Sequence, residues 1–145
     1  MLIKIVDDDQ VFVKKIKDIV YDNFKDIFLD YSIECITSNF EAQYFEKGDI
    51  FFLDIDLKEK NGIKIAEEIR ENNSNAIIIF VSAMNDMVFD SLIVQPFYFI
   101  RKDNFDRDMK IACTLIQNIL IKIIKLLLLI LMVKKQLFNY QISFI

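Results

Sequence analysis

The chain has 145 residues, enough for one domain with a hydrophobic core that needs no disulfide or metal to hold it together. Hydrophobic residues make up 54% of it and there are only two Gly and one Pro, which excludes a disordered chain. The absence of histidine excludes a Ser-His-Asp triad, a Cys-His nucleophile and His-containing zinc sites, so any bound metal would have oxygen ligands. Residues 1–103 carry 12 basic and 20 acidic side chains, and this acidic body is not expected to bind nucleic acid.

The start of the chain and its cysteines indicate a cytoplasmic protein. Lys4 interrupts the first apolar run and acidic residues follow at once, a pattern that does not fit a signal peptide. Cys35 and Cys113 lie far apart in the sequence and form no CxxC pair. We therefore expect two buried, reduced thiols.

Apolar runs alternate with helical patterns along the first hundred residues. Strands are predicted over residues 2–6, 31–36, 50–53, 76–81 and 97–101. Helices are predicted over residues 10–24, between Ser38 and Gly48, over 62–73 and 86–94, and from about residue 104. Uninterrupted apolar runs are typical of strands buried on both faces of a parallel sheet. The pattern therefore predicts an α/β fold, a doubly wound five-stranded parallel sheet with five helices.

The C-terminal segment is predicted to be an apolar extension of this domain. Residues 126–133 are eight apolar residues without a break, which is too few to cross a bilayer. The longer segment 111–133 is interrupted by polar residues, so no membrane span is expected. Residues 134–145 alternate between apolar and polar and are predicted to form an isolated strand. Because a lone strand has marginal stability, we expect residues 126–145 to be poorly ordered or buried by self-association.

Polar side chains that suit phosphoryl chemistry follow four of the predicted strands, and they are Asp7 and Asp8, Asp54, Ser82 and Lys102. Each has a plainer reading alone, since an Asp can cap a turn or helix and a Lys can be an ordinary surface charge. However, parallel strands end at one edge of the sheet, where these side chains can converge. The acids would then suit Mg²⁺, with one carboxylate acting as a nucleophile toward phosphorus. The Lys and Ser side chains would contact the phosphoryl oxygens.

This pattern resembles the receiver domain of two-component response regulators (CheY-like). The matching stretches, within residues 2 to about 120, are Val6-Asp7-Asp8, Leu53-Asp54 with Asn61-Gly62, Val81-Ser82-Ala83, and Phe99-Ile100-Arg101-Lys102. The resemblance implies that a sensor histidine kinase phosphorylates Asp54. It also implies an Mg²⁺ site formed by Asp7, Asp8, Asp54 and the backbone carbonyl of Asp56, with Ser82 and Lys102 sensing the phosphoryl group and Phe99 changing rotamer. The chain would be a stoichiometric phosphoacceptor rather than an enzyme, and open to homodimerisation.

Residues 96–102 look most like the branch whose output is a LytTR-type (AgrA-like) DNA-binding domain, which would link the switch to transcription regulation. Asp103 replaces the proline that usually follows the lysine in this family. The predicted domains are a receiver over residues 1–122 and a truncated or degenerate start of an output domain over 123–145. The second is too short to fold alone, so no residue of this chain is predicted to contact DNA.

Two other functions remain open. One is an interaction module that is never phosphorylated and that docks partners through its last two helices and fifth strand. The other is an Mg²⁺-dependent phosphatase with an aspartyl nucleophile, in which Asp56 would be the general acid. The first makes no use of the acidic residues, and the second lacks an evident cap domain or substrate pocket.

Overall fold

The structure, a computed structural model, describes residues 1–27 and 30–145. The chain divides into two compact units, Met1–Ala112 and Cys113–Ile145. The first contains all the strands of the sheet and every residue of the predicted site. The second is helical almost to its end.

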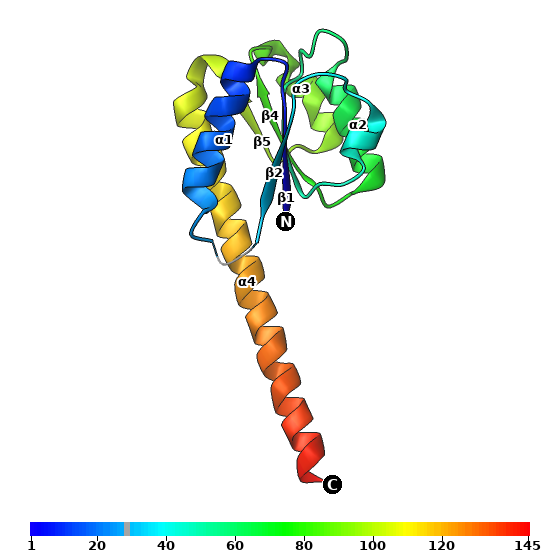
Figure 1. Cartoon of the computed structure of the whole chain (residues 1–145), viewed down its shortest axis with the longest axis vertical. Coiled ribbons are helices and arrows are strands. Elements are labelled where there is room, and N and C mark those ends of the chain that lie inside the picture. Colours follow the sequence, from blue (N-terminus) through cyan, green and yellow to red (C-terminus); the bar gives the residue numbers. More distant parts are fainter. Residues whose placement is uncertain (28–29) are drawn as a thin grey trace. The chain divides into compact units, whose positions relative to one another are not determined.

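A five-stranded parallel sheet forms the centre of the first unit (Figure 1). Its strands are β1 (Leu2–Val6), β2 (Ser32–Ile36), β3 (Ile50–Leu53), β4 (Ile77–Ser82) and β5 (Tyr98–Arg101). Their order is β2-β1-β3-β4-β5, and every neighbouring pair is parallel. The helix α1 covers one face, and α2 and α3 cover the other (Figure 1). The predicted doubly wound parallel sheet is therefore confirmed.

Within the described residues there are four α-helices, one fewer than predicted. They are α1 (Gln10–Phe24), α2 (Gly62–Asn72), α3 (Val88–Ser91, between 3-10 turns at Asn85–Met87 and Leu92–Val94) and α4 (Phe105–Ser143). The helix expected between Ser38 and Gly48 is only a 3-10 turn, Ala42–Phe45. Glu41 precedes this turn without a side-chain cap, and Asn39 has a left-handed φ of 55°. Without a side-chain cap and with a left-handed residue just before it, this connection does not nucleate an α-helix.

The core lies between the sheet and its helices. All four residues of β3 are buried, and Ile78 to Ser82 of β4 are buried as well, which matches the prediction of strands covered on both faces. On the face covered by α2, the predicted stripe Ile63, Ala66 and Ile69 packs into one hydrophobic cluster with strand residues such as Phe51 and Phe80. This rigid centre places the carboxyl ends of β1, β3, β4 and β5 at one edge.

The predicted burial of both cysteines is only half right. Cys113 is buried, and burial raises the pKa of its thiol to about 11. Cys35 is exposed. It lies on β2, which is an edge strand and is mostly uncovered by other elements.

The second unit corrects the prediction of a terminal strand. Residues 134–143 continue α4 as a helix (Figure 1), so the isolated strand over 134–145 is wrong. A helix satisfies its own backbone hydrogen bonds, whereas a strand without a partner leaves them unpaired. Within the described residues, one helix, Lys102–Ser143, has the length and apolar composition that a membrane-crossing helix requires.

Candidate functional site

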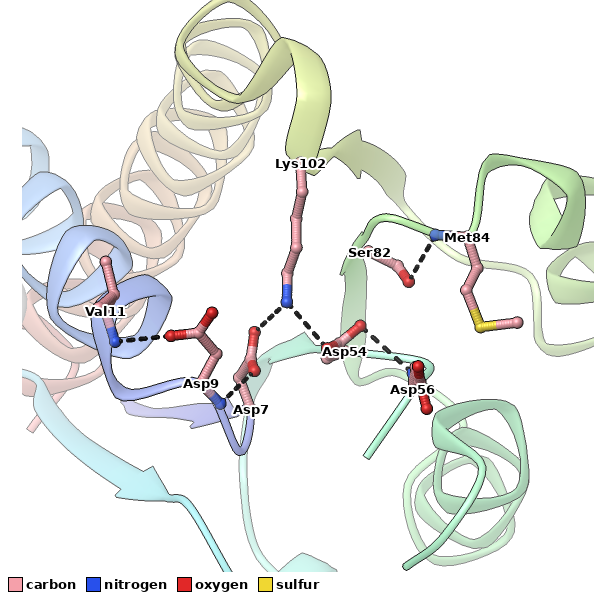
Figure 2. Close-up of polar contacts among 8 residues, drawn as sticks. All are labelled: Asp7, Asp9, Val11, Asp54, Asp56, Ser82, Met84 and Lys102. Atoms are coloured by element: carbon pink, nitrogen blue, oxygen red, sulfur yellow. Dashed lines mark hydrogen bonds and ion pairs between the residues drawn. The ribbon is translucent and has the colours of Figure 1, made fainter. Parts of the chain in front are cut away.

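The predicted site residues meet at the carboxyl edge of the sheet (Figure 2). Asp7 and Asp8 follow β1, Asp54 follows β3, and Lys102 follows β5. One carboxylate oxygen from each of the three aspartates lies within 4.8 Å of the others. The chain enters helices directly from this edge: the carboxylate of Asp9 accepts a hydrogen bond from the backbone N–H of Val11 and caps α1. The sequence therefore predicted this cluster correctly.

Lys102 is the cation of the cluster. Its Nζ lies 2.7 Å from Asp7 Oδ2 and 2.8 Å from Asp54 Oδ2. Burial lowers the pKa of Lys102, but hydrogen bonds to Asp54 and Asp7 outweigh that effect and leave the pKa above its usual value. Lys102 is therefore a permanent ammonium that joins the ends of β1, β3 and β5.

The acids are crowded and poorly solvated. Asp7 is 1% exposed and Asp54 is 4% exposed. Burial raises the pKa of Asp7 to about 6, although Lys102 acts in the opposite direction. One lysine charge faces three carboxylates, so the cluster has an excess of negative charge that a further cation would relieve.

The donor set fits a hard divalent cation. In the described part of the chain, Asp8 Oδ2 is buried and accepts no hydrogen bond, while the buried Asp7 Oδ2 is paired with Lys102 Nζ. Buried carboxylate oxygens without donors are the ligands that Mg²⁺ and Ca²⁺ prefer. The residues present therefore fit the predicted Mg²⁺ site.

The cluster opens onto a cavity of about 650 Å³. The cavity is lined by Asp8, Asp54 and Lys102 of the cluster, by the exposed loop residues Asp56 and Lys58, and by the half-buried Met84. The backbone N–H of Asp56 donates a hydrogen bond to Asp54 Oδ1 at 3.3 Å, which orients the carboxylate (Figure 2). Asp54 is thus buried within the fold and still reaches a space that a small phosphorylated group could enter.

Ser82 and Phe99 lie beside the cluster rather than in its ion pairs. Ser82 is fully buried at the end of β4, and its Oγ accepts a hydrogen bond from the backbone N–H of Met84 at 3.2 Å (Figure 2). Its hydroxyl can still donate one hydrogen bond. Phe99 is partly buried, and its ring centroid lies 6.1 Å from that of Phe80.

Two residues of this site were missed as site residues. The ring centroid of Phe12 lies 4.5 Å from Lys102 Nζ. The rings of Phe12 and Phe105 pack in a T-shaped pair, with their centroids 5.5 Å apart. The sequence pointed to Phe12 in one way, because this large aromatic residue lies outside the buried stripe of α1. The stripe is formed by Val13, Ile16, Val20 and Phe24.

Gly62 is the second. A Cβ at this position would lie 1.9 Å from the carbonyl oxygen of Asp54, so only glycine allows α2 to begin so close to the acceptor strand. The sequence showed Asn61-Gly62 as a motif but not the backbone that it approaches.

Known proteins show the same architecture and sequence pattern. The family model for the response regulator receiver domain matches residues 3–113. The sensory transduction protein LytT of Bacillus anthracis is 26% identical over 108 residues, which cover 74% of this chain and 44% of LytT. The chain thus spans less than half the length of this curated relative.

Solved structures agree with the fold. The response regulator TrrA of Thermotoga maritima, crystallised in complex with Mg²⁺-BeF, is 25% identical with a TM-score of 0.57, over 70% of this chain and 85% of TrrA. The signal receiver domain of a DNA-binding response regulator from Colwellia psychrerythraea is 20% identical with a TM-score of 0.65, over 82% of this chain and 98% of that one.

The matched residues 3–113 include the five strands except Leu2 of β1, and the whole acidic cluster with Lys102. They also coincide almost completely with the first compact unit. The predicted resemblance is confirmed: this chain belongs to the response regulator receiver domain family.

Proposed function

We propose that this chain is a phosphorylation-controlled switch of a two-component system and that a sensor histidine kinase transfers a phosphoryl group to Asp54. One observation carries the proposal. Asp54 is 4% exposed, yet it lines a cavity, contacts Lys102 at 2.8 Å, and shares a cluster with Asp7 and Asp8. A structural cap would need no such neighbours.

In this proposal an oxygen of the Asp54 carboxylate attacks the phosphorus atom. A phosphorus–oxygen bond forms while the bond from phosphorus to the histidine nitrogen of the kinase breaks, and that nitrogen keeps the electron pair. The Lys102 ammonium, now held between Asp7 and Asp54, would neutralise charge on the phosphoryl oxygens. The hydroxyl of Ser82 would donate a hydrogen bond to one of these oxygens, and Phe99 would change rotamer in response.

The carboxylates of Asp7, Asp8 and Asp54 would hold Mg²⁺, together with the backbone carbonyl of Asp56. When bound, Mg²⁺ supplies positive charge that stabilises phosphoryl oxygens during transfer. The Mg²⁺-BeF complex of the similar protein TrrA supports this assignment. The buried and unpartnered Oδ2 of Asp8 supports it independently.

The wider role is also proposed. The likeness to the sensory transduction protein LytT supports a role in signalling, and as a member of the receiver family the protein would be cytoplasmic. A LytTR-type output would then link phosphorylation to transcription, with the receiver over residues 1–122 and the start of an output segment over 123–145. The partners would be a sensor histidine kinase and, on phosphorylation, a second receiver.

The test is the intact mass of the protein after incubation with acetyl phosphate and Mg²⁺. We expect the wild type to gain one phosphoryl group and Asp54→Asn to gain none, because an amide is a poor nucleophile. Asp86→Asn, at an exposed residue near the end of β4, is the matched control and should be labelled like the wild type. Labelling of Asp54→Asn at the wild-type level would refute the assignment.

Mg²⁺ binding is tested separately by thermal unfolding. We expect Mg²⁺ to raise the melting temperature of the wild type, because it binds only the folded state. At a hundred times its Kd, Mg²⁺ should add about 2.7 kcal/mol to the free energy of unfolding. Asp8→Ala should lose most of this gain. A melting temperature of the wild type that does not respond to Mg²⁺ would argue against the metal site. Repeated turnover of a phosphate monoester would instead favour the phosphatase alternative.

A further inference from the structure

The end of α4 exposes apolar side chains around its whole circumference. Residues 126–133 are all apolar, and each is between 42% and 62% exposed. Successive residues of an α-helix are rotated by about 100°, so eight in a row leave no polar face. A helix of this kind is stable only in apolar surroundings.

The charge of this unit has one sign. Residues 113–145 contain four lysines, Lys122, Lys125, Lys134 and Lys135, and no acidic residue. Two lysines lie just before the apolar run and two lie just after it. The surroundings that suit this segment are therefore apolar and carry negative charge at their boundary.

Before and after the apolar run, most polar residues of the helix lie on one face. At about 100° per residue, the residues Lys122, Lys125, Lys135, Gln136, Asn139 and Ser143 fall within an arc of about 140°. Bulky apolar residues such as Ile130 and Leu137 lie on the opposite side and are exposed. Lys134 and Gln141 lie outside this arc, although the long side chain of Lys134 can extend past apolar neighbours to the headgroups. Leu128, Leu129 and Met132 of the apolar run fall within the same arc, so this polar side is limited to the two ends of the run, where lysines can reach the headgroups.

Crossing the bilayer fits less well. At about 1.5 Å per residue the uninterrupted run is about 12 Å long, while the hydrocarbon core is about 30 Å thick. A crossing helix would place a pair of these lysines inside the core, at high cost.

A second copy of the helix also fits less well. It would cover only one side of residues 126–133. It would also bring eight lysines together without one acidic partner. An anionic lipid surface provides both the apolar medium and the opposite charge.

We propose that residues 121–145 bind the surface of an anionic lipid bilayer, with residues 126–133 in the acyl region and the flanking lysines at the headgroups. This attachment involves only the second compact unit and does not depend on phosphorylation.

The experiment is flotation of the full chain with vesicles of phosphatidylcholine alone or mixed with phosphatidylglycerol. We expect the wild type to float with the mixed vesicles, and the double variant Leu127→Asp, Leu131→Asp to remain unbound. Lys134→Gln with Lys135→Gln should bind the mixed vesicles about 30-fold more weakly. Phe89→Asp is the matched control, since it removes an apolar side chain that is 83% exposed on the receiver, and it should float like the wild type.

The chain contains no tryptophan, so one introduced tryptophan reports its own surroundings. The emission of Ile130→Trp should shift to the blue with the mixed vesicles, and brominated lipids should quench it. Phe89→Trp should show neither effect. Equal flotation with neutral vesicles would overturn the proposal, and so would the absence of flotation. It would also be overturned if the emission of Ile130→Trp were already shifted to the blue without lipid, because a dimer buried the residue.

Discussion

At the scale of single residues, Lys102 owes its position to an aromatic ring as well as to two acids. The centroid of the Phe12 ring lies 4.5 Å from the Nζ atom that also contacts Asp7 and Asp54. A cation over an aromatic face is stabilised by about 1 kcal/mol when partly desolvated. Phe12 therefore holds the lysine where it can meet a phosphoryl group.

We expect Phe12→Leu to slow the labelling of Asp54 by acetyl phosphate about fivefold, since losing about 1 kcal/mol corresponds to that factor in rate. Phe12→Tyr keeps the aromatic face and should label like the wild type. The measurement is the rate of mass gain at fixed acetyl phosphate and Mg²⁺. Equal rates for Phe12→Leu and the wild type would show that the ring is only packing.

A second residue pair anchors the backbone beside Lys102. The side chain of Arg101 donates to both carboxylate oxygens of Asp108, at 2.7 and 2.9 Å, and its backbone N–H donates to Oδ2 at 3.1 Å. The hydrogen bonds from the Arg101 side chain lower the pKa of Asp108, against the opposing effect of burial. This pair joins the end of β5 to the first turn of α4.

The lowered pKa of Asp108 determines how the stabilisation from its pair with Arg101 depends on pH. Asp108 loses its proton more readily in the folded state than in the unfolded chain, so its stabilisation is complete above the unfolded pKa of about 3.9 and disappears as the pH falls through the lower folded value. Asp108→Asn should lower the free energy of unfolding at pH 7 by about 1 kcal/mol, because Arg101 is exposed enough for water to screen its charge.

The measurement for Asp108 is urea unfolding of both proteins from pH 7 down to pH 3. The difference between wild type and Asp108→Asn should shrink only at the acidic end of this range. Asp106→Asn, at an exposed acid in the same helical turn, should change stability little at any pH. A difference that is constant down to pH 3 would contradict the role of the ionised carboxylate.

At the scale of elements, the connection from β3 to α2 determines where the acceptor carboxylate points. Asn61 caps α2 by accepting a hydrogen bond from the backbone N–H of Ile63, and Gly62 N–H donates to the carbonyl of Ile55 at 2.8 Å. The helix therefore begins against the backbone that carries Asp54. The loop and the acceptor form one unit.

We expect Gly62→Ala to destabilise the fold by about 2 kcal/mol or more, since the new methyl group would overlap the Asp54 carbonyl and force the helix and strand apart. It should also slow phosphorylation of the fraction that folds. Lys64→Ala, at an exposed site in the same first turn, is the control and should leave both properties nearly unchanged. Thermal unfolding and the labelling rate together test this, and wild-type behaviour of Gly62→Ala would mean that the loop is freely adjustable.

At the scale of the whole molecule, the receiver and the helical end of the chain are separate in composition and compactness. Residues 1–112 form one compact unit that contains the sheet and the site, and the family match ends at residue 113. Beyond residue 125 every side chain is exposed. The receiver should therefore fold without the apolar end.

We expect a chain that stops at Lys125 to remain folded, to accept phosphate on Asp54, and to aggregate less than the full chain, because it lacks the exposed apolar run. Circular dichroism, intact mass after acetyl phosphate, and light scattering are the measurements. Unfolding of the shortened chain would show that residues 126–145 belong to the receiver core. Specific duplex binding by the full chain alone would contradict the prediction that this segment does not contact DNA.

The sequence by itself determined the class of fold and the members of the acidic cluster. The runs of β3 and β4 are apolar at every position, and only strands covered on both faces accommodate such runs. Once the strands are parallel, Asp7, Asp8, Asp54 and Lys102 must lie at one edge, so their convergence follows from local pattern and topology alone.

The tertiary structure decided what depends on contacts between distant segments. Phe12 beneath Lys102 and the approach of Gly62 to the Asp54 carbonyl arise from packing, which has no period in the sequence. Cys35 is exposed because its strand lies at the edge of the sheet. Residues 134–143 are helical because an alternating pattern specifies a strand only where a neighbouring strand can pair with it, and without that partner the helix satisfies the backbone on its own.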